Sequence, residues 1–463
     1  MNVDLRDIQA NVVTGYPDEL GLHRAEFVYA HVEAGHAAEG RAFLRELFPF
    51  VTSAAKTTDC KETGFALNVA LSHAGLVALE LPSPSLWSFQ PAFRRGMRKR
   101  ASLLADRPET WQDEWASGRP EVHILLSLFA TDSRIDEQLA SLERLVADAP
   151  GIRQVGRQSA GRLQDGDSFN REHFGFVDGI SNPAVTGVGE SEPIAGKRVV
   201  KGKVRRGRPI EREWATIAAG EFLLGHVDEA GKIENLEPEI LGRNGSFLVL
   251  RKLYQNVAAF RGYLQAESKR LGLDTEKLAE KLVGRRRDGT PLTDCDSADP
   301  NDFDYSRDPG TGCPLGSHIR RMNPRVGDES GDPQRKGGRR ALPDRTARHR
   351  IIRRGIPYGP PLEGSEDDEV DRGLLFLAFN ANFERQFEFL QARYAEDGDA
   401  ARQSYDKDPL IGRNEEKGSM VIPEDGRPPR IAQHLPTFVE TLGGEYFFTP
   451  SLNGLRWIGE GRW

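Results

Sequence analysis

A strand pattern that runs into an amphipathic helix pattern recurs along the chain, and this alternation restricts the fold more than any other feature of the sequence. It occurs at residues 23–51, 64–81, 121–150, 244–273 and 373–395. The two halves share the pattern with little identity in letters, which indicates a weak internal duplication. We therefore predict an α+β protein with two ferredoxin-like domains of the dimeric α+β barrel type and antiparallel sheets. A single α/β sheet is the alternative.

Three long segments rich in glycine, proline and charged residues interrupt this pattern, at 184–212, 284–316 and 323–350. Loops of this length in a compact protein usually carry function or are disordered. The first segment loses all hydrophobic periodicity, so we place a domain boundary within it. The expected domains are residues 1–195 and residues 196–463, the second with the other long loops as insertions.

The charge and the cysteines disfavour several classes of protein. With a net charge of −7, the chain of 463 residues gives no reason to expect the concentrated basic face that nucleic-acid binding needs. No apolar run approaches the roughly 18 residues of a membrane span. The three cysteines form no CxxC pair, and the first residues do not resemble a signal peptide. We therefore expect a cytoplasmic protein without a nucleic-acid or membrane partner.

The segment REHFGFVDGISNP (171–183) places one carboxylate among large apolar residues. Asp178 follows Phe174, Phe176 and Val177 and lies on a tight turn between glycines. Such surroundings disfavour the charged form of a carboxyl group, which makes Asp178 a candidate general acid or base. The alternative is a plain turn or helix-cap position, which an Asp-Gly pair often occupies.

The basic segment RHRIIRRGIPYGP (348–360) contains two isoleucines that could carry one arginine inward while the others stay in solvent. A surface edge strand protected by its charges is the alternative. The segment alone does not select among Arg348, Arg350, Arg353 and Arg354.

The segment CPLGSHIRRMNP (313–324) holds two residues that can bind a metal, Cys313 and His318. Small residues before His318 would let a flat ligand come close, and the nearby Arg320, Arg321 and Arg325 could bind its anionic groups. Cys313 competes for this role because a Cys-Pro pair is a weak cue for thiolate binding of haem iron. A structural, hydrogen-bonded histidine is the alternative.

Several familiar catalytic motifs are absent from the sequence, which has no GxxxxGKS phosphate loop, no HExxH and no GxSxG. The glycines of GRNGSFLVL (242–250) open a strand pattern, whereas a dinucleotide-binding glycine motif follows one. These absences disfavour phosphate-loop, zinc-protease, serine-hydrolase and Rossmann chemistry.

Together and in this order, GFVDG (175–179), CPLGSHIRRMNPR (313–325) and RRGIPYG (353–359) resemble the motifs of the dye-decolorizing peroxidase family. GFVDG matches the family's GxxDG motif, and the resemblance covers most of the chain. It implies haem b held in the C-terminal domain, and hydrogen peroxide as the oxidant of dyes and of phenolic or other aromatic donors through a ferryl intermediate. It also allows a homodimer. A haem-binding carrier or sensor that uses Cys313 and Pro314 is the alternative.

The resemblance implies roles for individual residues by their positions in the motifs. His318 matches the proximal histidine that binds the haem iron. Asp178 matches the distal acid, and Arg353 matches the distal arginine. A proximal histidine normally donates its second ring N–H to an acceptor, for which we favour Asp408. The alternative acceptors are Glu384 and Glu388.

Three more residues have implied contacts with the cofactor. Leu374 and Phe376 would cover the distal face of the haem, with plain strand core as the alternative. Arg320 would bind a haem propionate, with an exposed salt bridge as the alternative.

Overall fold

The computed structural model of the protein describes residues 3–16, 18–163, 171–188, 197–201, 211–293, 303, 305, 307–325, 345–399 and 406–463, with backbone only for 197–201 and 211–215. The domain boundary predicted between residues 195 and 196 therefore lies outside the described residues.

The N-terminal half contributes four antiparallel strands in the spatial order β4-β1-β3-β2. Their bounds are β1 Arg24–Val32, β2 Phe65–Ser72, β3 Ile124–Ala130 and β4 Ile152–Gly161. The helices between them include α2 Ala37–Leu47, α4 His73–Ala78 and α8 Ile135–Asp148. The buried residues of α8, which are Ile135, Leu142 and Val146, recur at helical spacing on the face that packs on the sheet.

The C-terminal half repeats this strand order with the strands β13-β7-β10-β8, and β9 pairs beside β8 on β10. The bounds are β7 Ser246–Gln255, β8 Ile352–Arg353, β9 Ile356–Tyr358, β10 Gly373–Asn380 and β13 Val439–Thr449. In both halves the fourth strand lies beside the first and the third beside the second, as in a ferredoxin-like βαββαβ unit. The antiparallel α+β architecture expected from the sequence is confirmed.

The two halves do not form two separate sheets. β13 pairs with β2 through Phe447 opposite Ser72 and Phe448 opposite Leu71, so that one antiparallel sheet of nine strands crosses both halves. The pairing covers backbone groups of β2 and β13 that would otherwise lie at exposed sheet edges. The hydrophobic core likewise draws residues from both halves.

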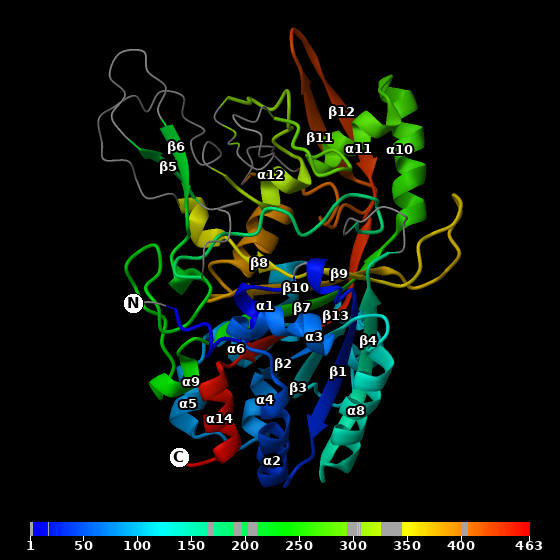
Figure 1. Ribbon diagram of the computed structural model, residues 1–463. Helices are drawn as coiled ribbons and strands as arrows, with labels where there is room; N and C mark the ends of the chain where they lie inside the picture. Colours follow the sequence, from blue (N-terminus) through cyan, green and yellow to red (C-terminus); the bar gives the residue numbers. More distant parts are fainter. Residues whose placement is uncertain are drawn as a thin grey trace.

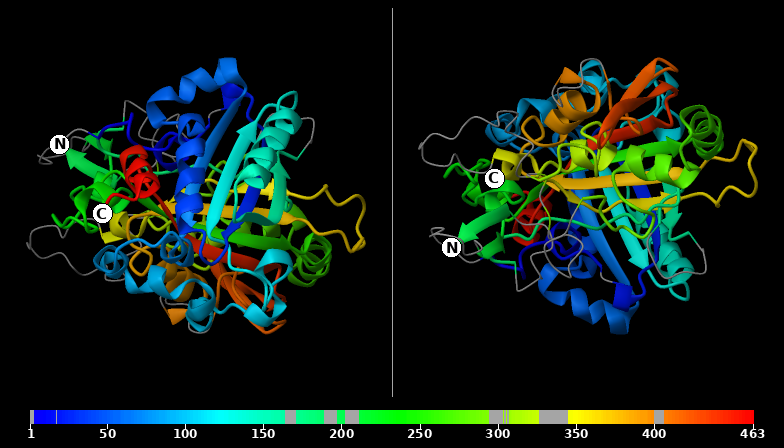
Figure 2. Two further views of the ribbon diagram at one scale, coloured as in Figure 1. Left: turned by 90° about the horizontal axis from the view of Figure 1, so that it is seen from below. Right: turned by 90° about the horizontal axis from the view of Figure 1, so that it is seen from above.

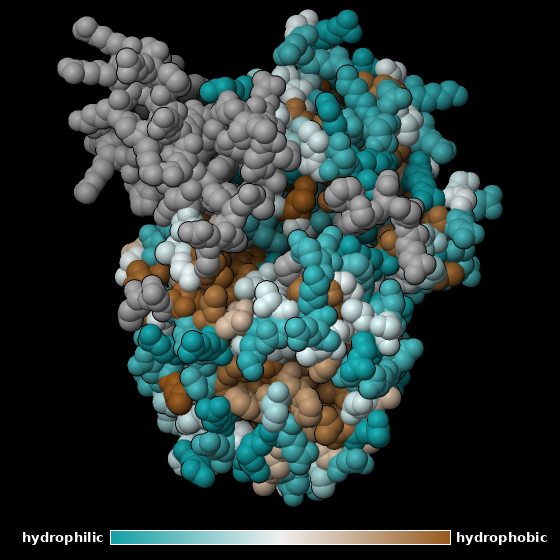
Figure 3. All heavy atoms as spheres, in the orientation of Figure 1, coloured by the Kyte–Doolittle hydropathy of each residue, from teal (hydrophilic) through white to brown (hydrophobic). Residues whose placement is uncertain are grey.

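The helices lie on both sides of this sheet. α2, α4 and α8 cover the N-terminal strands in the lower part of Figure 1, and α10 (Val257–Leu271), α11 (Thr275–Val283) and α12 (His318–Met322) lie above the C-terminal strands. The views from below and above show the two helical layers in turn (Figure 2). The face seen in Figure 3 is mostly hydrophilic, with apolar residues gathered in patches over its lower half. Within the described ranges no helix is long and apolar enough to cross a membrane.

Several elements lie where the sequence pattern predicted none. They are β4, the hairpin of β11 (Gly418–Glu424) and β12 (Arg427–Leu435), β13, and α14 (Leu452–Glu460). The segment 184–212, expected as a loop, contains β5 (Lys197–Lys201) and the start of β6 (Glu211–Ala215), which pair with each other. The helix expected within 373–395 is a short α13 (Phe387–Phe389) followed by a π-helical turn at Leu390–Ala395.

A cluster of phenylalanines binds the two halves together around Phe247 of β7. Its ring lies 5.4 Å from Phe93 and 6.2 Å from Phe89 of the N-terminal half, measured between ring centroids. It lies 5.0 Å from Phe383 and 5.9 Å from Phe448 of the C-terminal half. Because Phe247 is fully buried, its removal opens a cavity that both halves share.

We expect Phe247→Ala to lower the free energy of unfolding by about 3–5 kcal/mol, the usual cost of such a truncation in a core. Both halves should unfold in one transition at a lower denaturant concentration, followed by circular dichroism and tryptophan fluorescence. Ile431→Ala, at a side chain that is exposed on β12, is the control and should change the free energy by less than about 0.5 kcal/mol. Two separate transitions in the variant would show that the halves are not coupled through this cluster.

Candidate functional site

A cavity with an empty volume of about 1380 Å³, part of it open to solvent, lies between α12 and the strands β7, β10 and β13. Aliphatic and phenylalanine side chains form most of its wall. The polar residues that line it are Glu172, Asp178, Arg251, Gln255, His318, Asn323, Arg353, Gln391 and Thr441. The cavity therefore suits a large, mainly apolar ligand that makes a few defined polar contacts.

His318 enters the cavity wall from the first position of α12, on the side away from the sheet. Its Nδ1 lies 3.1 Å from Oδ1 and 3.0 Å from Oδ2 of Asp408. A carboxylate accepts but does not donate, so Nδ1 carries the proton and donates it. In the neutral imidazole the lone pair is then on Nε2, where a metal can bind.

Asp408 is fully buried, and its charge is compensated by several donors. Oδ1 accepts the backbone N–H groups of Leu410 at 2.9 Å and of Ile411 at 3.0 Å, in addition to its contact with His318. Burial by itself raises the pKa of Asp408, but the neighbouring His318, the Ile411 N–H and Arg321 outweigh it and hold the pKa below its usual value. The carboxylate is therefore ionised and fixes the orientation of the imidazole.

Asp178 and Arg353 form an ion pair in the wall of the same cavity. Arg353 Nη1 donates to Asp178 Oδ1 at 3.0 Å, and Nη2 donates to the carbonyl oxygen of Ile180 at 2.8 Å. The Asp178 side chain is 19% exposed and that of Arg353 is 27% exposed. Asp178 is thus not the lone carboxylate in apolar surroundings that the sequence suggested, because the arginine comes from a segment about 175 residues away.

The turn that carries Asp178 is held by Glu172, which also lines the cavity. Its carboxylate accepts the backbone N–H groups of Phe174 and Phe176, both at 2.8 Å, and the side-chain amide of Gln255 at 2.6 Å. Burial raises the pKa of Glu172 above its ordinary value, although these three donors oppose the rise. The backbone leading into Asp178 is therefore fixed to the end of β7.

Gly355 keeps the space beside the ion pair open. A Cβ atom at this position would lie 3.2 Å from Asp178 Oδ2 and 3.3 Å from a methyl carbon of Leu374, so a larger side chain would press on both. Asp178, Arg353 and Gly355 also line a second hollow of about 1280 Å³ on the side of the N-terminal segment. The ion pair therefore lies where two hollows adjoin, and part of the Asp178 side chain is exposed there.

Leu374 and Phe376 lie two residues apart on β10, so their side chains point to the same face of the sheet. Both line the cavity and both are only partly buried, unlike their neighbour Leu375, which is fully buried. They form part of its sheet-side wall. The structure thus places them at the cavity rather than in plain strand core.

The arginines after His318 do not line the cavity. Arg320 is buried, donates to the carbonyl oxygen of Cys313 at 2.7 Å and lies 3.6 Å from the carboxylate of Asp308. The alternative of an exposed salt bridge is wrong, because Arg320 is buried, and its contact with a propionate stays a prediction. Arg321 donates to three backbone carbonyl oxygens, and Arg325 donates to that of Phe303. Buried carbonyl groups that no helix or strand pairs need hydrogen-bond donors, and these arginines supply them.

Cys313 is also absent from the cavity wall. It is fully buried, and its Sγ lies 3.1 Å from the hydroxyl oxygen of Ser317 and 3.7 Å from the carbonyl oxygen of Gly284. Of the two candidate metal ligands in this segment, only His318 faces the cavity.

The other candidates occupy different positions. Glu388 pairs with Arg100 at 2.8 Å, and Glu384 lies 3.4 Å from the same arginine, so neither contacts His318. Of the four arginines at 348–354, only Arg353 lines the cavity beside Asp178. The partners of the other three include Asp228 for Arg348, the carbonyl oxygen of Ser181 for Arg350, and the carbonyl oxygens of Asn11 and Val13 for Arg354.

Sequence reasoning did not find two charged residues of the wall, Glu172 and Arg251. Arg251 is buried on β7 and pairs with Asp106 and with the hydroxyl group of Thr441. A signal was present for each. Arg251 interrupts an apolar strand pattern, and Glu172 is the acidic residue of the same motif that contains Asp178.

Comparison with protein families and curated proteins supports one assignment. The model of the Dyp-type peroxidase C-terminal region matches residues 241–407. Over 98% of its length the chain is 30% identical to the dye-decolorizing peroxidase msp1 of Mycetinis scorodonius, of which it covers 88%. It is 31% identical to the multifunctional dye peroxidase DyP2 of an Amycolatopsis species, over 91% of this chain and 90% of that protein.

The fold agrees with this assignment. A solved structure of a dye-decolorizing peroxidase in complex with 2,6-dimethoxyphenol superposes with a TM-score of 0.77 and 25% identity, over 99% of this chain and 100% of that one. Similarity in sequence and in fold thus extends over almost the whole chain. The chain belongs to the dye-decolorizing peroxidase family.

Proposed function

We propose that this protein binds haem b in the cavity between α12 and the sheet and uses hydrogen peroxide to oxidise dyes and phenolic donors. One observation carries the proposal: His318, which Asp408 orients from behind, and the Asp178–Arg353 pair line the same mainly apolar cavity. The names of the relatives and the bound dimethoxyphenol of one related structure support these substrate classes.

The residues present fit haem b. The cavity is large and mostly apolar, as a porphyrin requires, and the imidazole of His318 is oriented by a buried carboxylate, as in other histidine-bound metal sites. Leu374 and Phe376 would contact the face of the cofactor opposite His318. Haem b supplies an iron at which peroxide binds and its O–O bond is cleaved.

In this function His318 and Asp408 hold the cofactor and tune it. The ionised Asp408 accepts the Nδ1–H of His318, which makes Nε2 a stronger base and a stronger ligand. Because Asp408 is itself held by backbone N–H groups, it cannot follow a rotation of the imidazole, and such a rotation would break the hydrogen bond from Nδ1.

Asp178 and Arg353 act on the peroxide. The carboxylate of Asp178 takes a proton from one peroxide oxygen and returns it to the other, so that water can leave. Arg353, which is always charged, stabilises the negative charge that develops on the departing oxygen. The hydrogen bond of 3.0 Å between the two side chains keeps acid and cation in one fixed geometry.

The alternative of a carrier or sensor that uses Cys313 and Pro314 has no support in the geometry, because Cys313 faces Ser317 and Gly284 rather than the cavity. The cytoplasmic location, the homodimer and the division at residue 195 stay predictions of the sequence.

We expect His318→Ala to lower the haem content of the purified protein about tenfold or more, because the protein ligand of the iron is lost. The measurement is the ratio of the pyridine haemochrome to protein. His434→Asn is the control, because His434 is exposed on β12 and its φ of 55° is one that asparagine tolerates. Full haem occupancy in His318→Ala would disprove the assignment of the ligand.

Asp178→Asn should leave the haem content unchanged and slow the reaction of the ferric enzyme with hydrogen peroxide by about 10²–10⁴-fold, the usual contribution of a general acid or base. The amide can still accept from Arg353 but cannot take up a proton. Stopped-flow absorbance in the Soret region measures the rate. An activity optimum at acidic pH should also disappear, and a wild-type rate would contradict the role of Asp178 as the proton carrier.

Arg353→Leu should slow the same step by about 10²–10³-fold, as the loss of an electrostatic stabiliser does. Arg353→Lys is the matched comparison, because it keeps the charge but cannot bind Asp178 and the Ile180 carbonyl group together. Its rate should lie between those of the wild type and the leucine variant. Equal rates in all three would assign the distal cation to another residue.

A further inference from the structure

We propose that Glu221 is a positioning residue for Arg353 and Asp178: with Asp228 it anchors Arg385 and Gln386, which hold residues 348–350, and through them β8, in place. This rests on the roles given above to Arg353 and Asp178, but the anchoring itself is a property of the fold. None of the anchoring residues lines the cavity.

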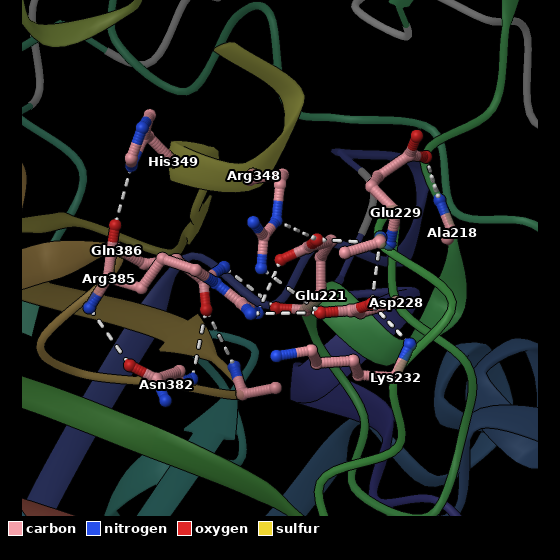
Figure 4. A network of polar contacts seen from close by, with 12 residues as sticks. Ala218, Glu221, Asp228, Glu229, Lys232, Arg348, His349, Asn382, Arg385 and Gln386 are labelled. Carbon is pink, nitrogen blue, oxygen red and sulfur yellow. Dashed lines mark hydrogen bonds and ion pairs between the residues drawn. The ribbon is translucent and has the colours of Figure 1, made fainter. Parts of the chain in front are cut away.

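The two carboxylates bind two arginines from different parts of the chain (Figure 4). Arg385 donates to Glu221 Oε2 at 2.7 Å and to Asp228 Oδ2 at 2.9 Å. Arg348 donates to the same oxygen of Asp228 at 3.4 Å, and its Nε lies 3.7 Å from Glu221 Oε1. The side chain of Glu221 has no exposed surface. Replacing its carboxylate by an amide would remove the charge that binds Arg385 and one of the two acceptor oxygens.

Gln386 connects this cluster to the backbone that leads into β8. Its Nε2 donates to the carbonyl oxygens of Glu221 and Arg350, both at 2.7 Å. The residue between Arg348 and Arg350 is also held: Nδ1 of His349 lies 2.6 Å from the carbonyl oxygen of Arg385, and its ring stacks on Phe389 at 3.9 Å. Residues 348–350 are thus bound either to the carboxylate of Asp228 or to Arg385 and Gln386.

From Arg350 the contacts continue to both members of the ion pair. Arg350 Nη2 donates to the carbonyl oxygen of Ser181, three residues after Asp178. Asn182 accepts the backbone N–H of Arg353 at 2.9 Å and donates to its carbonyl oxygen at 3.2 Å. Ser181 and Asn182, which follow Asp178, are therefore bound to Arg350 and Arg353. The first of these arginines belongs to the anchored residues 348–350.

The two ends of β8 are held by different contacts. β8 is two residues long and pairs with β10 through Arg353 opposite Ala378 and Ile352 opposite Phe379. After it, the Arg354 N–H donates to the carbonyl oxygen of Leu377 at 2.8 Å, and β9 pairs with β10 from Ile356. These contacts hold the C-terminal end of the short strand, and the anchored residues 348–350 hold its N-terminal end. Buried ion pairs are weak contributors to overall stability, which makes a local positioning role the better explanation of why two carboxylates are buried here.

The test compares Glu221→Gln with the wild-type holoenzyme at pH 8. This pH is chosen because burial raises the pKa of Glu221 to about 7, against the lowering effect of Arg385, so that the carboxylate is ionised. Hydrogen exchange measured by mass spectrometry should show exchange at residues 350–354 faster by about tenfold or more. The haem content should stay the same, and the rate of the reaction with peroxide should fall by about tenfold or more.

Glu26→Gln is the matched control. Glu26 is also a buried carboxylate beside an arginine, Arg157, but it lies on β1. It should change neither the exchange at 350–354 nor the peroxide rate. Gln386→Met removes the bridge and leaves every charge in place, and it should reproduce the faster exchange. If Glu221→Gln does not yield folded protein, Gln386→Met alone tests whether the anchoring holds residues 350–354.

A double variant separates positioning from a general loss of stability. If Glu221 acts through the pair of Arg353 and Asp178, then Glu221→Gln should slow the peroxide step by a smaller factor in an Arg353→Leu background than in the wild type. Additive losses, or unchanged exchange at 350–354 in Glu221→Gln and Gln386→Met, would overturn the proposal. A normal peroxide rate in Arg353→Leu alone would instead overturn the proposed role of Arg353, while the exchange data would still report the anchoring.

Discussion

The buried charge of Asp408 is the constraint on which the rest of the site depends. A carboxylate without solvent is costly unless donors surround it, and here His318 and the backbone N–H groups of Leu410 and Ile411 supply them. The loop around Asp408 and the start of α12 must therefore keep one relative position. That position fixes the imidazole, and with it the side of the cavity away from the sheet.

The opposite side of the cavity is built differently. Asp178 lies on an irregular turn and Arg353 on a strand of two residues, so neither has an extensive regular element beneath it. Side-chain contacts take the place of that support: Glu172 ties the turn to β7, and Asn182 ties it to β8. One wall of the cavity is thus fixed by a buried charge and the other by a set of side-chain hydrogen bonds, which can keep Asp178 and Arg353 in place beside an open hollow.

Much of the fold follows from local sequence pattern, and the exceptions have physical reasons. β1, β2, β3 and α8 were predictable because their apolar residues recur with a clear period. β4 was not, because it lies at the edge of the sheet and its sequence, IRQVGRQSAG, is largely polar. β13 contains Gly443, which ordinarily argues against a strand, but a Cβ atom there would lie 2.2 Å from the ring of Trp115.

The candidate site could be predicted only as separate motifs. The residues His318, Asp178 and Arg353 each stand in a recognisable segment, but nothing in the spacing shows that Asp408, 90 residues after His318, would meet it. The placing of Arg320 could not be predicted, because the sequence does not tell whether an arginine of a short helix turns toward a cavity or toward a neighbouring loop, as Arg320 does here. Glu221 and Gln386 had no motif at all, since their partners lie far apart in sequence.

The position of β13 also has a consequence for synthesis of the chain. This strand lies between β2 and β7, in the middle of the sheet, although it comes after both of them in the sequence. While the chain emerges from the ribosome, β2 and β7 each keep an unpaired edge until residues 439–449 have been made. Apolar strands with open edges can pair with other chains, so nascent copies are open to association until that late strand closes the sheet.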